Sequence, residues 1–401
     1  MHMKHKRIYS NTLIVLPFGL PFLWSADYEL QTAIALTSRG ATVIAYLANE
    51  GRTLFHLLST PSPIFEIKYG VIMYRPLYIL PFHRFRAIRI ANYWIATKWL
   101  IFIISLTPQW KKLKKIFWTF SLQRSVYPLW FNKTVFKIYD CVDMFMPGRR
   151  RDIPEWLREE RRILEASDVI FTNSPVLYEQ KRKKYPHVFL LPEGMFIPAL
   201  FPARTHTSEP VALASIPHPR VLFVGNINTR LDFATIRRVA TRLPHYSFIF
   251  VGNTDVLFSG PDGVSLKNEI DSWNKQKNIY PLPAVPRNKI ASYIRSSDIG
   301  FIPYDIRQQF NKYCYPIKIQ EFFSQGKPVV ASAIETLKSL SPLSLIYRTP
   351  DEAVYTLKKT LSRPWPKVYQ AKQRRIALSN SVDNKLAKAE TILLKYFSRV
   401  F

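Results

Sequence analysis

The chain is poor in cysteine and in acidic residues. Two of its 401 residues are cysteines, Cys141 and Cys314, which excludes a disulfide framework and leaves no cysteine spacing typical of a metal site. We therefore expect a reducing, cytoplasmic compartment. No repeat at a solenoid period is visible, and a hydrophobic content of 47% excludes disorder as a description of the whole chain.

The shortage of acid leaves a large positive charge. The chain has 57 Lys and Arg residues but 28 Asp and Glu residues, so its formal net charge is +29. An excess of this size concerns partners rather than fold. Nucleic acid, an anionic membrane surface and a phosphate-bearing substrate all remain open. The deficit is sharpest between Glu66 and Asp140, where no acidic residue occurs and Lys and Arg alternate with Trp, Tyr and Phe.

This basic aromatic segment (residues 67–139) has three interpretations. Cations mixed with aromatic residues suit the headgroup region of an anionic bilayer, where each basic residue near the surface contributes about 1 kcal/mol. Its apolar run at 99–106 is shorter than the roughly 20 residues that a spanning helix needs, so we expect the segment to lie on a membrane. The aromatic residues could instead be core beneath a solvated basic face. Base stacking on nucleic acid is the third interpretation, and no recognition motif accompanies it.

The N-terminus imitates a secretory signal, because basic residues precede an apolar run over 12–24. Pro17 and Pro21 interrupt that run. A helical pattern then ends at Gly40 and leads into the apolar stretch ATVIAYL, as in a βαβ unit. We therefore expect the first run to be a strand.

Short β-branched runs alternate with helical patterns over most of the chain, which predicts an α/β protein with parallel sheets. The runs are TLIVLPF, ATVIAYL, VFKIYD, DVIFTNS, RVLFVGN, HYSFIFVGN, DIGFIPY and KPVVAS. Residues 205–218 are rich in Pro, Ser and Thr without a period, which indicates a linker. We predict domains over 1–204 and 219–375 and a C-terminal helix over 376–401, with the helical pattern of the tail beginning near Tyr369.

The clearest candidate site lies in residues 298–332, DIGFIPYDIRQQFNKYCYPIKIQEFFSQGKPVVAS. A strand is expected to end at Tyr304. A helix expected over 316–325 offers backbone N–H groups and Lys318 in its first turn, which suits a diphosphate. Glu321, one turn further on, can accept two hydrogen bonds from a ribose diol. Taken alone, Lys318 and Glu321 are better explained as a plain i,i+3 pair on a helix.

With its neighbours, this motif resembles the nucleotide-sugar half of GT-B glycosyltransferases. Pro-x-Lys-x-x-Glu followed by GKPVV is similar to family 4-like enzymes and to teichuronic-acid-type bacterial transferases. Further similar segments are RVLFVGNINTRLDF, NIYPLPAVPRNKIASYIRSSDIGFIPY, VFKIYDCVDMF and EASDVIFTNS. The resemblance implies two Rossmann-like, doubly wound domains that face a cleft, with the C-terminal helix returning to the N-terminal domain.

The resemblance also implies roles for the residues around the donor phosphates. Gly225 and Asn226 would bring backbone amides close to the diphosphate, since glycine has no side chain to prevent the approach. Lys318 would neutralise the diphosphate, and Glu321 would hold the ribose.

Other parts of the donor pocket follow from the same resemblance. Tyr304 would line the pocket and Tyr280 would lie near the base. No metal and no cofactor beyond the nucleotide sugar are implied, in agreement with the lack of a convincing Asp-x-Asp dyad. LPEGMF at 191–196 departs from the Asn-Gly-Val-Asp-like turn of relatives, so contacts of that turn do not carry over.

Two aspartates follow the run VFKIY, where catalytic groups of open α/β sheets gather. This segment is also similar to xanthan-type glucuronosyltransferases, in which an aspartate is the base. Asp143 is the match, and it would take the proton of the acceptor hydroxyl in an inverting transfer. Asp140 aligns less well and would orient the loop, or be a turn or cap residue. A retaining enzyme would present a histidine, for which His83 is the nearest upstream candidate.

We therefore expect a metal-independent glycosyltransferase that moves a sugar from a nucleotide-diphosphate donor, with a UDP-sugar favoured. The expected acceptor is a membrane-held, polyprenyl-diphosphate-linked saccharide in bacterial surface polysaccharide synthesis. The expected location is cytoplasmic, peripheral to the inner face of an anionic cell membrane, and nucleic acid is disfavoured as a partner. The alternative is a non-catalytic peripheral membrane or nucleic-acid-binding protein on the same fold.

Overall fold

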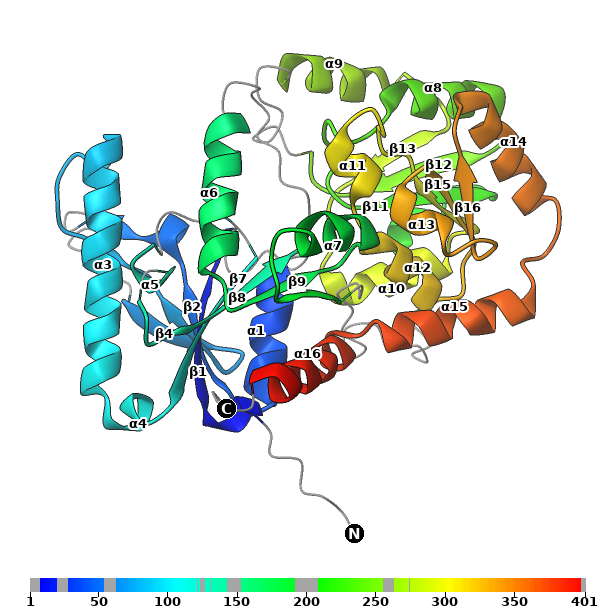
Figure 1. Ribbon diagram of the computed structural model, residues 1–401. Helices are drawn as coiled ribbons and strands as arrows, with labels where there is room; N and C mark the ends of the chain where they lie inside the picture. Colours follow the sequence, from blue (N-terminus) through cyan, green and yellow to red (C-terminus); the bar gives the residue numbers. More distant parts are fainter. Residues whose placement is uncertain are drawn as a thin grey trace, which may run out of the picture. The chain divides into compact units, whose positions relative to one another are not determined.

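The computed structural model describes residues 8–19, 28–53, 63–120, 122, 127–130, 132–142, 153–191, 208–254, 263–273 and 275–397. These residues form two compact units (Figure 1). The first unit holds the described residues up to 191 together with 382–397, and the second holds 208–381. Both are built on parallel sheets, so the expected α/β class is confirmed.

The sheet of the first unit has the order β10-β9-β8-β7-β1-β2-β5-β4 among the described residues, and only the β4–β5 pairing is antiparallel. Its strands are β1 (Thr12–Pro17), β2 (Thr42–Tyr46), β4 (Phe65–Lys68), β5 (Val71–Tyr74), β7 (Lys114–Thr119), β8 (Phe136–Cys141), β9 (Val169–Thr172) and β10 (Val188–Leu190), with β3 (Arg52–Thr53) and β6 (Leu77–Tyr78) paired separately. β1 and β8 are buried along their whole length. Strands covered on both faces read as continuous apolar runs, which confirms the expectation that the run at 12–18 is a strand.

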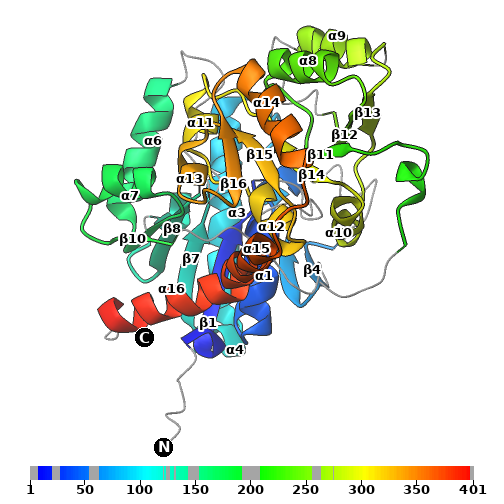
Figure 2. The same ribbon diagram turned by 90° about the vertical axis from the view of Figure 1, so that its right-hand side faces the viewer.

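Helices cover both faces of this sheet. They are α1 (Tyr28–Ser38), α3 (Arg86–Leu106), α4 (Pro108–Lys111), α5 (Tyr127–Trp130), α6 (Ile153–Ala166), α7 (Pro175–Arg182) and α16 (Val382–Phe397). α1 and α16 lie on one side and α3 lies on the other (Figures 1 and 2). α16 is held by bonds to the start of the chain: Tyr9 Oη donates to the carbonyl of Leu386 (3.2 Å) and the Ile8 amide donates to Glu390 (2.7 Å).

Helix α3 is longer than the sequence indicated. Its 21 residues are long and apolar enough to cross a membrane by length and composition alone, although 28% of its apolar window is buried against the unit. The expectation that rested on the short run at 99–106 is therefore wrong about length, because the helix begins thirteen residues earlier, at Arg86. Length and composition alone do not distinguish a helix that crosses a membrane from one that lies on it, whereas the contacts of α3 with its own unit do.

The second unit has a six-stranded parallel sheet of order β13-β12-β11-β14-β15-β16, which is 3-2-1-4-5-6 when its strands are counted from β11. This is the strand order of a dinucleotide-binding Rossmann sheet. The strands are β11 (Arg220–Val224), β12 (Ser247–Val251), β13 (Ile279–Leu282), β14 (Ile299–Ile302), β15 (Val329–Ser332) and β16 (Ser344–Tyr347). The helices are α8 (Phe233–Arg242), α9 (Gly263–Trp273), α10 (Arg287–Arg295), α11 (Gln309–Tyr313), α12 (Lys318–Ser324), α13 (Glu335–Lys338), α14 (Pro350–Leu361) and α15 (Lys367–Ser379).

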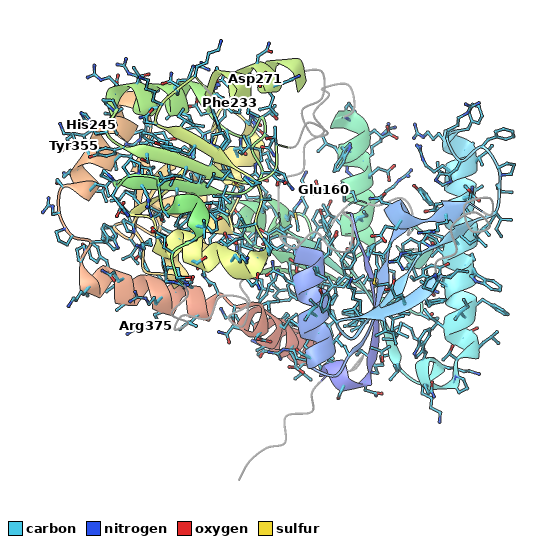
Figure 3. All side chains as sticks on the ribbon, turned by 180° about the vertical axis from the view of Figure 1, so that it is seen from behind. Glu160, Phe233, His245, Asp271, Tyr355 and Arg375 are labelled. Atoms are coloured by element: carbon cyan, nitrogen blue, oxygen red, sulfur yellow. The ribbon has the colours of Figure 1, made fainter. Side chains whose placement is uncertain are left out.

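Aromatic packing fixes the first helix of this unit on its sheet. Asp232 caps α8 by accepting a hydrogen bond from the Thr235 amide at 3.1 Å. The ring of Phe233, labelled in Figure 3, lies 5.6 Å from that of Trp273. Trp273 in turn lies 4.5 Å from Phe250 of β12 and is fully buried. The helix expected from Asp232 to Arg242 is thus confirmed.

The tail of the chain is two helices rather than one. α15 ends at Ser379, and the backbone amide of Asn380 still bonds to the carbonyl of Ile376. α16 begins at Val382, and from that residue on the tail belongs to the first unit.

Candidate functional site

The strand order of the second unit places its topological switch point between β11 and β14. These two strands are paired, and the connections that follow them run to opposite sides of the sheet. Ligands of open α/β sheets bind beyond the carboxyl ends of the strands at such a point. Gly225 follows β11, and Tyr304 lies two residues beyond β14. The structure thus brings both predicted residues to one edge of the sheet.

The backbone conformation of Gly225 favours glycine, and the space where a side chain would begin is occupied by the flexible end of Lys318. The φ of Gly225 is +135°, which side chains rarely permit, and a Cβ added there would lie 2.3 Å from Cε and 2.6 Å from Nζ of Lys318. Its amide is bonded to the carbonyl of Val251 at 2.9 Å. The exposed residue Asn226 comes next. The end of the Lys318 side chain therefore lies directly over the glycine turn.

The charge of Lys318 is held in place but has no carboxylate partner in the part of the chain that the structure describes. Its Nζ donates to Tyr304 Oη at 3.0 Å and lies 5.4 Å from the ring of Phe223. Lys318 is the first residue of α12, which has only seven residues, so attraction of an anion rests on the lysine charge rather than on the helix. Lys318, Gly225 and Tyr304 together form a cationic floor at the switch point, which we call the Lys318 site.

An arginine that the sequence did not single out joins the two loops around this site. The Arg230 guanidinium lies 4.4 Å from the ring centroids of both Tyr304 and Phe310. Its Nε donates to Asn311 Oδ1 at 2.8 Å, and Asn311 is fully buried. The Asn311 amide donates to the carbonyls of Arg230 and Asp305 at 3.1 and 3.0 Å. The loop after β11 is therefore fastened to the loop after β14.

Glu321 is paired with a second arginine that the sequence did not single out. Its Oε1 lies 3.3 Å from Nη2 of Arg287, and both side chains are only 5% exposed. The alternative of a simple Lys318–Glu321 helix pair is not what the structure shows, because the two residues contact different partners. A carboxylate held by a buried arginine on one oxygen can offer the other oxygen to a ligand.

Tyr280 is placed differently from the other predicted donor residues. It lies in β13, which is separated from β11 by β12, and its side chain is half-buried against the core of the unit. Among the described residues no polar contact joins it to the Lys318 site. Its proximity to a base stays a prediction.

Asp140 is part of an ion pair rather than a turn or a cap. β8 continues through it to Cys141, and its Oδ2 lies 2.8 Å from Nζ of Lys385 on α16, with the two side chains 1% and 2% exposed. Lys385 also lies 5.5 Å from the ring of Phe120. The expectation of a turn or cap residue is therefore wrong. Asp143 lies outside the described residues.

His83 is engaged in packing. Its ring stacks on Tyr78 at 4.2 Å, and Nδ1 lies 3.3 Å from the amide nitrogen of Asn92. Partial burial, with a smaller contribution from the Arg89 cation, lowers the pKa of His83. These contacts give His83 a structural place beside α3. Among the described residues no group of three His, Cys, Asp or Glu side chains could hold a metal ion.

Known structures share this architecture over nearly the whole chain. Sucrose-phosphate synthase from Thermosynechococcus elongatus matches with a TM-score of 0.72, covering 97% of this chain and 100% of that chain at 17% identity. A trehalose-6-phosphate synthase from E. coli bound with UDP-2-fluoro glucose matches with a TM-score of 0.67, covering 95% and 99% at 10% identity. The chain has the GT-B fold.

Among curated proteins, this GT-B chain is similar to a Bacillus subtilis (strain 168) protein assigned as the teichuronic acid biosynthesis glycosyltransferase TuaH. The two are 28% identical over 260 residues, which are 60% of this chain and 62% of the relative. The resemblance to teichuronic-acid-type transferases is thereby confirmed. No protein-family model matches the chain.

Proposed function

We propose that this GT-B protein is a glycosyltransferase whose donor is a nucleotide-diphosphate sugar, with UDP as the nucleotide. One observation carries the proposal: an ammonium group that has no carboxylate partner among the described residues lies over a glycine turn at the switch point of a Rossmann sheet. A dianionic diphosphate is the ligand that such a cation and a side-chain-free turn fit. That the E. coli neighbour holds a UDP-sugar analogue supports the choice of donor.

Each residue of the second unit has a defined part in this proposal. Lys318 neutralises the diphosphate, and Gly225, whose own amide is bonded to the Val251 carbonyl, leaves room for the diphosphate to approach the Asn226 amide. Tyr304 lines the pocket and fixes the lysine. Glu321 accepts the ribose hydroxyls with the oxygen that faces away from Arg287. No metal takes part, because the lysine supplies the charge that would otherwise come from a cation.

The acceptor in this proposal is a saccharide on a polyprenyl diphosphate, used in bacterial surface polysaccharide synthesis. The likeness to a protein assigned to teichuronic acid biosynthesis supports a polysaccharide product. The basic aromatic segment supports an acceptor held at an anionic membrane, and the protein is then peripheral to its cytoplasmic face. Transfer is inverting, with Asp143 as the base.

Lys318→Ala should weaken UDP binding about 10- to 100-fold, because hydrogen bonds to a charged group contribute about 1.5–3 kcal/mol. Isothermal titration of UDP into both proteins measures the difference. Lys289→Ala is the matched control, since it removes an exposed lysine of α10 in the same unit and should leave the affinity unchanged. Equal UDP affinity in wild type and Lys318→Ala would remove the basis of the proposal, and so would a wild-type protein that binds no nucleotide.

Glu321→Gln should reduce the preference for UDP over 2′,3′-dideoxy-UDP about tenfold, since the carboxylate is the ribose acceptor. The variant also removes the Glu321 charge from beside the buried Arg287 guanidinium, which lowers stability. The double variant Arg287→Met with Glu321→Gln separates the two effects, because it removes both charges. The preference should stay lost in the double variant while the melting temperature recovers. A full preference for UDP in either variant contradicts the ribose role.

A further inference from the structure

Helix α3 carries a continuous apolar stripe that faces away from its own unit. Ile95, Trp99, Phe102 and Leu106 are spaced four, three and four residues apart, so they lie on one face of the helix. They are 37%, 52%, 49% and 63% exposed. The loop before the helix continues the stripe with four more exposed apolar side chains, Ile79, Leu80, Phe82 and Phe85. An exposed apolar surface of this extent marks an interaction site.

The charges that α3 and its flanking loops contribute are all positive, and one of them, Arg86 at the start of the helix, is paired with Glu155 of α6 at 2.6 Å. No acidic residue occurs between Glu66 and Asp140 in the sequence. Lys98 lies on the same face of α3 as the stripe, and Lys111 and Lys112 follow the C-terminal end of the helix; all three are exposed. At the other end, the Arg84 guanidinium lies 5.0 Å from the ring of Phe85. Aromatic rings with flexible cations beside them match a surface whose headgroups are anionic and whose interior is apolar.

Side chains beside and behind this stripe bond α3 to the unit along its length. Asn92 exchanges hydrogen bonds with the backbone of Leu80 at 2.9 and 3.0 Å. Tyr74 Oη donates to the carbonyl of Ala96 at 2.9 Å, and the hydroxyls of Tyr46 and Thr97 are 3.2 Å apart. Asn92, Ala96 and Thr97 are at most 2% exposed. A helix fixed sideways to a sheet cannot cross a bilayer without drawing those strands into it, although about 31 Å of helix would be long enough.

We propose that α3 and the loop over residues 79–85 form a docking surface for an anionic bilayer, with the helix axis parallel to the membrane plane. The rings of Trp99 and Phe102 enter the headgroup and upper acyl region, and Lys98, Lys111 and Lys112 reach sideways to lipid phosphates. The role of this contact rests on the proposed function, since it would hold the first unit beside a lipid-linked acceptor. Its test needs neither donor nor acceptor.

The test is co-sedimentation with vesicles of phosphatidylcholine, with and without phosphatidylglycerol. Wild-type protein should bind the mixed vesicles and lose binding when phosphatidylglycerol is omitted or salt is raised. Trp99→Ser with Phe102→Ser should lower the partition coefficient about tenfold or more. Tyr355→Ser is the matched control, because Tyr355 is an aromatic residue of α14 in the other unit with 63% exposure, labelled in Figure 3. It should bind as wild type does.

The outcomes separate this proposal from the proposed function. Unchanged vesicle binding by the Trp99/Phe102 double variant would overturn the docking surface. Resistance of the wild-type protein to alkaline carbonate extraction would overturn the in-plane arrangement in favour of a spanning helix. The docking surface would also be overturned if the wild-type protein bound RNA but not vesicles, and if the Trp99/Phe102 double variant lost this RNA binding. Vesicle binding without UDP binding would support the docking surface and would contradict the proposed function, which requires a UDP-sugar donor.

Discussion

Lys385→Met should lower the free energy of unfolding of the first unit by about 3–5 kcal/mol, because it leaves the Asp140 carboxylate buried without a counterion. The two charges lie 2.8 Å apart, and neither side chain is more than 2% exposed. The variant should also loosen α16, which is held in addition by the hydrogen bonds of Tyr9 and Ile8 and by the contacts of Arg39 with Asp383 and Glu390. Hydrogen exchange of the amides of α16 and β8, followed by mass spectrometry, reads this unit separately from the other.

Two comparisons make the Lys385 result specific. Lys184→Met replaces an exposed lysine that follows α7 in the same unit, and it should change stability by less than about 0.5 kcal/mol. Asp140→Leu combined with Lys385→Met removes both charges and should recover much of the loss, because apolar residues of similar size replace a buried pair at little cost. If the amides of α16 and β8 exchanged no faster in Lys385→Met than in wild type, the Asp140–Lys385 pair would not stabilise the packing of α16 against β8.

The strands were predictable where both of their faces are buried. β1 and β11 read as unbroken apolar runs because helices cover the sheet on both sides. β7 was not predicted, since it begins with two lysines inside the basic aromatic segment. In the structure Phe117 and Trp118 of β7 are fully buried, whereas Trp99 of α3 is half exposed. The core interpretation is therefore right for β7, whereas the aromatic residues of α3 are exposed, and composition alone cannot separate the buried part of the segment from the exposed part.

The candidate site was predictable where a local motif carries it. Lys318 and Tyr304 lie fourteen residues apart in one motif, and their hydrogen bond follows from a strand, a loop and a helix in sequence. Glu321 and Arg287 are thirty-four residues apart on different helices, and no periodicity connects them. The Asp140–Lys385 pair joins a strand to a helix almost at the far end of the chain. Such pairs depend on tertiary packing, which propensity and spacing do not encode.

The Asp140–Lys385 pair argues against one of the two aspartates that follow VFKIY as the catalytic base. A general base must reach the acceptor hydroxyl within hydrogen-bond distance. Asp140 cannot, because it is fully buried and faces a buried lysine. Of the two carboxylates, Asp143 is left as the candidate, in agreement with its match to the base of xanthan-type glucuronosyltransferases.

Asp143→Asn should lower the rate of sugar transfer by about 10²–10⁴-fold, the usual contribution of a positioned base, while the affinity for UDP stays that of wild type. The rate is measured as donor-dependent transfer to a polyprenyl-diphosphate saccharide in mixed vesicles, and the affinity by calorimetric titration. Glu179→Gln is the control, since it neutralises an exposed carboxylate of α7 in the first unit and should retain full activity. Because removal of the base acts on the chemical step alone, a loss of UDP affinity in Asp143→Asn would indicate a donor role instead, and unchanged turnover would exclude Asp143 as the base.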